Sequence, residues 1–346
     1  MIDSNLELRR SGLTWQACRV PCLLRSLLVE LFLGVKWSPS GHEESTMNWE
    51  IELLQEPYGA VSEGPVWDGS TLLYTQIQAC RIMRFDPQTG SISVYRTDTH
   101  YANGLTLDVQ NRIYACEGGA RRVVRYEADG STTVLADQFE GKRLNVPNDL
   151  VIDRQERVWF TDPFYEGAAG PFSYDRVHQE LQHESVYRLD RRSDSSWSIE
   201  RVTFDTTRPN GVLLSLDQRT LFVAQSGRRS DEKRELRAYP IEASGQLGSP
   251  TVLHDFGEYR GVDGMRLDSE GNIVATAGFE LGGPGPSIYI FSPAGEILER
   301  HPVPANRPTN CVFGDDDLGT LYITTTEGHL LRARTERRGN RLTGNV

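Results

Sequence analysis

One short pattern recurs along this chain and limits what it can fold into. A polar residue, in most copies followed by glycine, opens an apolar run that alternates with polar residues, and a turn and a second apolar run then follow. The six copies begin at Glu63, Asn103, Asn148, Asn210, Asp263 and Asn310. Alternation of this kind indicates paired strands, and recurrence at intervals of about 40 to 60 residues is typical of a solenoid or a propeller.

A third and usually a fourth strand-like run completes each copy, as RIMRFD and ISVYRT do after the first pair. Repeated four-strand units without helical periodicity predict an all-β fold, a six-bladed β-propeller with four-stranded antiparallel blades. The stretch WEIELL, which begins at Trp49, is expected to pair with a terminal blade and close the ring. Closure removes exposed sheet edges, which otherwise invite aggregation.

The repeats divide the chain into three parts. Residues 1–46 form a non-conforming N-terminal extension, residues 47–335 the propeller domain, and residues 336–346 a short C-terminal tail. Within the extension, the apolar stretch CLLRSLLVELFLGV is interrupted by Arg25 and Glu30 and is too short to span a membrane. We therefore expect no folded role for the extension.

The net charge limits the classes of partner that this protein can bind, and the cysteine content indicates its cellular compartment. The net charge of −11, with no basic cluster, argues against a nucleic-acid partner. Five cysteines without a C-x-x-C pair form no disulfide framework and indicate a reducing compartment, so we expect a cytoplasmic protein. The expected partner is a small molecule, with no membrane association and a monomeric or weakly homo-oligomeric state.

A closed ring brings equivalent positions of its repeats to one axis, which is where Glu63, Asn148, Asn210 and Asp263 are expected to meet. Carboxylate and amide oxygens are the ligands that hard divalent cations prefer. These four residues therefore predict a metal site on the axis. Asn-Gly and Asp-Gly are also ordinary turn dipeptides, but six copies in register, one of them Glu63-Gly64-Pro65, favour the site.

The motifs around these positions resemble those of the SMP-30/gluconolactonase/luciferin-regenerating family, and their details resemble its microbial gluconolactonase branch. The similar segments cover about residues 50–332 and occur in the family's order: Ser62-Glu63-Gly64-Pro65, Asn145-Val146-Pro147-Asn148-Asp149, Phe160-Thr161-Asp162-Pro163, Pro209-Asn210-Gly211 and Val262-Asp263-Gly264. The resemblance implies a divalent cation, usually Ca²⁺, held by Glu63, Asn148, Asn210 and Asp263. Mg²⁺, Mn²⁺ and Zn²⁺ remain alternatives. It also implies hydrolysis of a sugar lactone such as gluconolactone to the aldonic acid.

The charge development in lactone hydrolysis suggests a role for each residue. A cation with an open position stabilises the oxyanion, and Asp263, both a ligand and close to the substrate, is the predicted catalytic base. Glu63 is expected to be a ligand only. Asn103, Glu117 and Arg122 are the predicted substrate contacts. Two alternatives stay open: a phosphotriesterase-like hydrolase on the same scaffold, and a propeller that binds a ligand or partner without catalysis.

Overall fold

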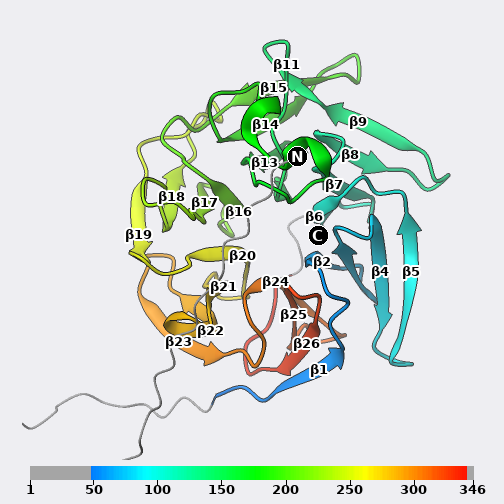
Figure 1. Ribbon diagram of the computed structural model, residues 1–346, viewed down its shortest axis with the longest axis vertical. Coiled ribbons are helices and arrows are strands. Elements are labelled where there is room, and N and C mark those ends of the chain that lie inside the picture. The colour runs from blue at the N-terminus through cyan, green and yellow to red at the C-terminus, as the bar shows by residue number, and fades with distance from the viewer. Residues whose placement is uncertain (1–47, 341–346) are drawn as a thin grey trace, which may run out of the picture. The chain divides into compact units, whose positions relative to one another are not determined.

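Sets of four antiparallel strands account for most of the protein. The computed structural model describes residues 48–340, so the predicted extension, residues 1–46, lies outside the described residues. Six four-stranded sheets form six blades around a centre, which confirms the predicted propeller (Figure 1). A small two-stranded hairpin of β10 (Gln138–Phe139) and β11 (Lys142–Arg143) is separate from the blades.

Each blade runs from an inner to an outer strand, and the blades are numbered here in chain order. The first three blades are β2 (Ser62–Trp67), β3 (Leu72–Gln76), β4 (Arg81–Asp86) and β5 (Ser91–Thr97); β6 (Ala102–Leu107), β7 (Ile113–Glu117), β8 (Arg122–Tyr126) and β9 (Thr132–Ala136); and β12 (Leu150–Ile152), β13 (Val158–Asp162), β14 (Ser185–Arg191) and β15 (Trp197–Arg201). The last three are β16 (Pro209–Leu214), β17 (Thr220–Gln225), β18 (Glu235–Pro240) and β19 (Thr251–Asp255); β20 (Val262–Leu267), β21 (Ile273–Phe279), β22 (Gly282–Phe291) and β23 (Ile297–Pro302); and β24 (Pro308–Gly314), β25 (Thr320–Thr325), β26 (Leu330–Arg334) and β1 (Ile51–Gln55).

The ring is closed by strands from the two ends of the described chain. β1 pairs antiparallel with β26, with Ile51 opposite Ala333, and so becomes the outer strand of the sixth blade. Just before β1, the Trp49 indole stacks on the His301 ring of the fifth blade at a centroid separation of 3.8 Å. The predicted pairing of the WEIELL stretch with a terminal blade is therefore confirmed.

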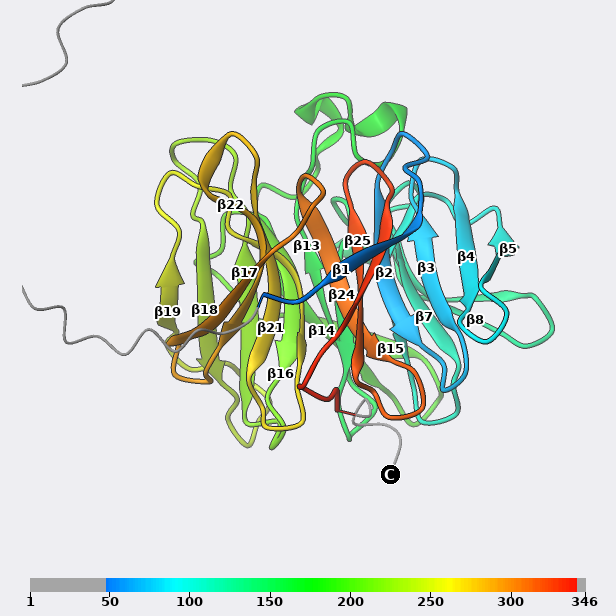
Figure 2. The same cartoon turned by 90° about the horizontal axis from the view of Figure 1, so that it is seen from below.

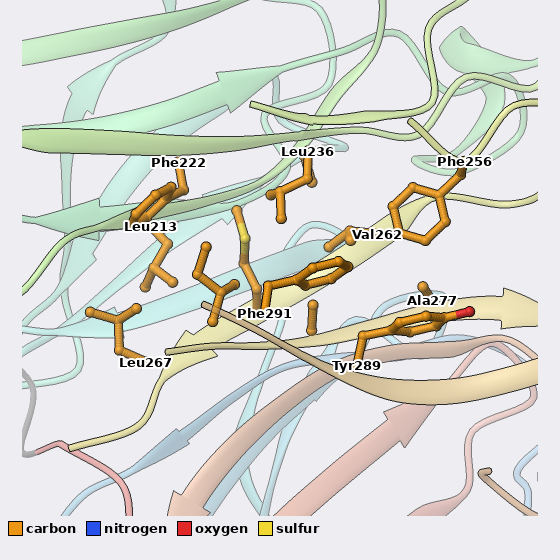
Figure 3. Close-up of a cluster of buried hydrophobic side chains, with 13 residues drawn as sticks. Leu213, Phe222, Leu236, Phe256, Val262, Leu267, Ala277, Tyr289 and Phe291 are labelled. Carbon is orange, nitrogen blue, oxygen red and sulfur yellow. The ribbon is translucent and has the colours of Figure 1, made fainter. Parts of the chain in front are cut away.

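Apolar side chains between neighbouring blades form the core. Six clusters of buried residues each join one blade to the next. Figure 3 shows the cluster between the fourth and fifth blades, where Phe222 and Leu236 meet Val262, Tyr289 and Phe291. Strands in the middle of a blade are thus covered on both faces, and β3, β7 and β13 are buried along their whole length. This explains why the second run of each repeat is almost continuously apolar.

The chain leaves the repeat in one long insertion, residues 163–184, between β13 and β14. It contains two short 3-10 helices, η1 (Pro171–Ser173) and η2 (Arg176–His178), and projects from one end of the blades, in green in Figure 2. A small buried cluster that includes Val146, Phe164 and Ala169 anchors the insertion. This anchoring positions Tyr165 of the insertion for the site described below.

Residues that follow the last strand also contact a blade. Arg337 forms an ion pair with Asp268 at 2.5 Å, and the Ser269 amide donates to the Arg338 carbonyl at 2.8 Å. The part of the predicted tail that the structure describes, residues 336–340, therefore packs on the fifth blade. In the described range no helix combines the length and the apolar character that a membrane crossing requires.

Candidate active site

The inner strands carry the polar repeat residues at the centre of the ring. Each inner strand contacts the inner strand of the next blade, from β2 through β6, β12, β16, β20 and β24 back to β2. In every blade but the third, the pairing register of the inner strand shifts at the polar residue, as it does between Glu63 and Val66 and between Val262 and Met265. Such bulges re-aim side chains and are frequent beside active sites. The Asn-Gly and Asp-Gly pairs therefore lie within strands and do not form hairpin turns.

The glycine after the polar residue is required by the neighbouring blade. Gly64 has a positive φ of 52°, and a Cβ on it would lie 2.2 Å from the main-chain oxygen of Asn103. No side chain can be accommodated at that distance without moving the backbone. In the four copies that carry it, this glycine lets one blade approach the axial residue of the next blade closely.

A cavity of about 450 Å³ lies at the centre of the ring, beside the axial residues. It is lined by the four predicted metal ligands, Glu63, Asn148, Asn210 and Asp263, and by Asn103. These residues come from five different blades and lie up to two hundred residues apart, between 63 and 263 in the chain. Closure of the ring is what brings them together.

The Glu63 carboxylate is buried and has few positive partners. It accepts hydrogen bonds from its neighbour's amide, that of Gly64, at 2.5 Å and from Asn310 Nδ2 at 3.0 Å. Burial, together with the nearby carboxylates of Asp263 and Asp149, raises the pKa of Glu63 to about 8. The centre of the ring therefore holds clustered acidic groups that are short of compensating positive charge.

Asp263 is held from two sides. Its Oδ1 accepts a hydrogen bond from Asn210 Nδ2 at 2.5 Å, and its Oδ2 forms an ion pair with Arg260. Burial raises the pKa of Asp263 above its ordinary value even though Arg260 acts in the opposite direction. A carboxylate that is oriented in this way, with a raised pKa, is suited to accept a proton from a bound water.

The donor set fits an oxygen-ligated divalent cation. Asn103 Oδ1 is buried without a hydrogen-bond partner in the described chain, and the Asn148 amide, which lines the cavity, makes no side-chain hydrogen bond to another residue in the range 48–340. These free oxygens accompany the buried carboxylate of Glu63 and the partly buried carboxylate of Asp263, and Ca²⁺ and Mg²⁺ prefer such ligands. Among residues 48–340 no three His, Cys, Asp or Glu side chains group as a metal site, so the set depends on its amides.

Sequence reasoning missed several residues of this cavity. Tyr165, from the insertion, accepts a hydrogen bond from Asn210 Nδ2 at 2.9 Å, and burial raises the pKa of its phenol. Arg228, Arg260 and Arg307 also line the cavity. All four lie in connections outside the repeated strand pairs, where the repeat carries no signal. Asn310, the axial residue of the sixth copy, does not line the cavity but donates to the Glu63 carboxylate.

Two of the predicted substrate contacts lie elsewhere. Glu117 is buried at the end of β7, where its carboxylate accepts from Arg122 Nε at 2.6 Å and from the Tyr126 hydroxyl at 2.9 Å. Neither Glu117 nor Arg122 lines the cavity. The two side chains satisfy each other within the second blade, whereas Asn103 of the same blade faces the cavity.

The fold and the cavity together define a class of protein, a six-bladed β-propeller with an oxygen-rich polar pocket on its axis. Residues 61–327 match the SMP-30/gluconolactonase/LRE-like region. The chain therefore belongs to this family, as its motifs predicted.

Individual relatives agree with this assignment. A gluconolactonase of Zymomonas mobilis is 30% identical over 300 residues, which cover 80% of this chain and 78% of the relative. A 6-deoxy-6-sulfogluconolactonase of Pseudomonas putida is 25% identical over 291 residues, 81% of this chain and 88% of the relative. Among solved structures, a gluconolactonase of Xanthomonas campestris superimposes with a TM-score of 0.68 at 28% identity and covers 83% of this chain and 89% of that one.

Proposed function

We propose that this protein is a lactonase that opens a sugar lactone to the aldonic acid with the help of a divalent cation, most simply Ca²⁺. One observation carries the proposal: Glu63 and Asp263 and the amides of Asn148 and Asn210 line a single cavity at the centre of the ring. Membership of a family of lactonases supports the reaction class. The amide and carboxylate oxygens support the cation.

The reaction sets the demands on the site. Water adds to the lactone carbonyl carbon, the bond to the ring oxygen breaks, and one proton passes from the water to that oxygen. Negative charge develops on the carbonyl oxygen in the transition state. When bound, the cation supplies Lewis-acid polarisation of this oxygen.

Residues of the chain would carry out the proton transfer and bind the substrate. Asp263, oriented by Asn210 and Arg260, accepts the proton of the attacking water and can return it to the ring oxygen. Tyr165 keeps its phenolic proton because burial raises its pKa, so it can donate to a substrate oxygen. Asn103, with its unpartnered Oδ1, can accept from a sugar hydroxyl.

The test is acid release from glucono-1,5-lactone by the purified protein, with and without a chelator, with a phosphotriester as the comparison substrate. We expect lactone hydrolysis that the chelator removes and that a divalent cation restores. Faster turnover of the phosphotriester than of any lactone would support the alternative hydrolase. A folded, cation-loaded protein that hydrolyses neither substrate would overturn the proposal and favour a non-catalytic propeller.

The names of the relatives leave the charge of the substrate open. One of them acts on gluconolactone and another on 6-deoxy-6-sulfogluconolactone, a neutral and an anionic lactone respectively. The choice between these two classes depends on the residues that line the outer part of the cavity.

A further inference from the structure

The cavity is unusually rich in arginine for an acidic protein. Arg228, Arg234, Arg260 and Arg307 all line it, although the chain carries a net charge of −11. The carboxylates in the same lining are Glu63 and Asp263 on the axis and the exposed Glu258. Four arginines therefore accompany three carboxylates in the lining of the cavity that contains the axial residues.

Two of these arginines already bind other groups of the protein. Arg260 bonds Asp263 and donates to the carbonyls of Gly278 at 3.0 Å and Pro308 at 3.1 Å. Arg234 donates to the carbonyls of Gly257 at 3.2 Å and Arg229 at 3.0 Å. Their hydrogen-bonding capacity is largely used, so they shape the wall of the cavity.

Arg228 and Arg307 are held differently. The Arg228 guanidinium lies 5.3 Å from the ring centroid of Tyr165, and that of Arg307 lies 5.5 Å from the ring centroid of Phe279. Within residues 48–340 neither guanidinium makes an ion pair or a side-chain hydrogen bond. The two acidic residues nearest in sequence to Arg228 have other partners: Asp231 pairs with Arg229 at 3.5 Å, and Glu232 pairs with the buried Arg208 at 3.1 Å.

An aromatic support orients a guanidinium without neutralising it. The face of the ring attracts the cation, and the N–H groups at its edge stay free for a ligand. At Arg307 the backbone also takes a positive φ of 48°, unusual for a residue with a side chain, and the Arg307 carbonyl accepts from the Thr326 amide at 3.1 Å. Unfavourable backbone conformations of this kind are often retained at binding sites.

We propose that the substrate is an anionic lactone, bearing a phosphate, sulfonate or carboxylate group at the end remote from the carbonyl, and that Arg228 and Arg307 bind this oxyanion. The inference rests on the proposed lactonase function and adds the charge class of the substrate. Arginine forks match the geometry of oxyanions, and charge-assisted hydrogen bonds are stronger than those to neutral hydroxyls. A volume of about 450 Å³ falls within the range of about 300 to 1,000 Å³ that is common for small-molecule sites.

The experiment compares kcat/KM for matched neutral and charged lactones. Glucono-1,5-lactone is paired with its 6-phospho and 6-deoxy-6-sulfo derivatives, and glucono-1,4-lactone with glucaro-1,4-lactone. We expect at least one charged lactone to exceed its neutral partner by about tenfold or more, and added salt to reduce this ratio. The member of the set with the highest ratio identifies which oxyanion is preferred.

Variants then assign the preference to the two arginines. Arg228→Gln and Arg307→Gln should each lower the ratio of charged to neutral kcat/KM, and the double variant should bring it to about one. Arg192→Gln removes the same charge from an exposed position outside the cavity and should leave the ratio unchanged. Circular dichroism and a melting temperature verify that each variant is folded.

Two results would overturn the inference. One is a neutral lactone hydrolysed as well as, or better than, every charged partner, and the other is an unchanged preference in the double variant. If the folded protein hydrolyses no lactone at all, the proposed function fails instead. Calorimetric titration with 6-phosphogluconate and gluconate separates the cases, because tighter binding of the phosphate that needs Arg228 and Arg307 supports the anion site without turnover.

Discussion

The Cα of Gly211 packs against the main-chain carbonyl of Asp263. Asp263 is the axial residue of the next blade. A Cβ at residue 211 would lie 2.4 Å from that carbonyl oxygen. The same close approach joins Gly64 to Asn103. In the four repeats that carry this glycine, the spacing between blades and the position of the axial side chains therefore depend on it.

Gly211→Ala should destabilise the protein by about 3 kcal/mol and also lower its activity, because the new methyl group must push the Asp263 backbone away. Gly248→Ala is the matched control. Its Cβ would meet nothing closer than Pro240 at 3.6 Å, so its free energy of unfolding should change by less than about 0.5 kcal/mol. Urea unfolding measures both variants. Equal stability of the two would show that the close contact is not required.

Asp263→Ala should abolish lactone hydrolysis. Asp263→Asn keeps an oxygen ligand but loses the base, so kcat should fall by about 10² to 10⁴ while some cation remains bound. Steady-state kinetics with elemental analysis of the same samples separates the two effects. Hydrolysis by Asp263→Asn at the parental rate would place the base on another residue.

Chelation should remove activity and lower the melting temperature, because a cation that binds only the folded state stabilises it by mass action. Ca²⁺, Mg²⁺, Mn²⁺ and Zn²⁺ should restore activity to different degrees, with the hard ions favoured by the oxygen ligands. Gluconate, the acid formed from the neutral lactone, should inhibit only weakly. Full activity in protein that elemental analysis shows to be free of every divalent ion would exclude the cation from the mechanism.

The contact between Trp49 and His301 should make stability depend on pH. The His301 Nδ1 accepts from the Trp49 amide at 3.3 Å, so its Nε2 carries the proton and donates to Glu299 at 2.9 Å. Burial lowers the pKa of His301 below its ordinary value of 6.5, and neighbouring Arg337 lowers it further, although Glu299 and Glu336 raise it. The unfolded chain therefore binds this proton more readily, and His301 contributes stability that is present above pH 6.5 and lost as the pH falls.

His301→Phe keeps an aromatic ring against Trp49 and removes the titration. Unfolding free energies measured from about pH 8 to about pH 5 should fall less steeply for this variant than for the parent protein. The comparison uses slopes, so a constant loss of stability in the variant does not affect it. Identical slopes would show that His301 does not titrate differently in the folded and unfolded states.

Removal of residues 1–46 should leave a folded and active protein, because strands between Ile51 and Arg334 complete every blade. Removal of residues 1–55 also deletes β1 and the Trp49 stack, and should lower the melting temperature markedly or cause aggregation through the exposed edge of β26. Melting curves and size-exclusion chromatography compare the two truncations. Insolubility of the shorter truncation would mean that the extension contributes to the fold.

The repeat alone predicted the propeller, the four strands of each blade and the pairing of the Trp49 segment that closes the ring. Strand alternation is a local property that can be read along the chain. The recurrence of one polar residue at one register position also predicted that Glu63, Asn148, Asn210 and Asp263 meet, since equivalent positions of a closed ring share its axis. Their role as metal ligands stays a prediction.

Only the tertiary structure decided which side chains surround those axial residues. Glu117 and Arg122 have suitable chemistry, yet they lie opposite each other on the paired strands β7 and β8 and form a mutual ion pair. Tyr165, Arg228 and Arg307 come from connections that differ between blades. The connection that carries Tyr165 is held by packing of its own Phe164 and Ala169 against Val146. A periodic pattern specifies the strands and axial residues that the blades have in common. Much of the cavity wall comes instead from connections that differ from blade to blade, and the repeat carries no information about those.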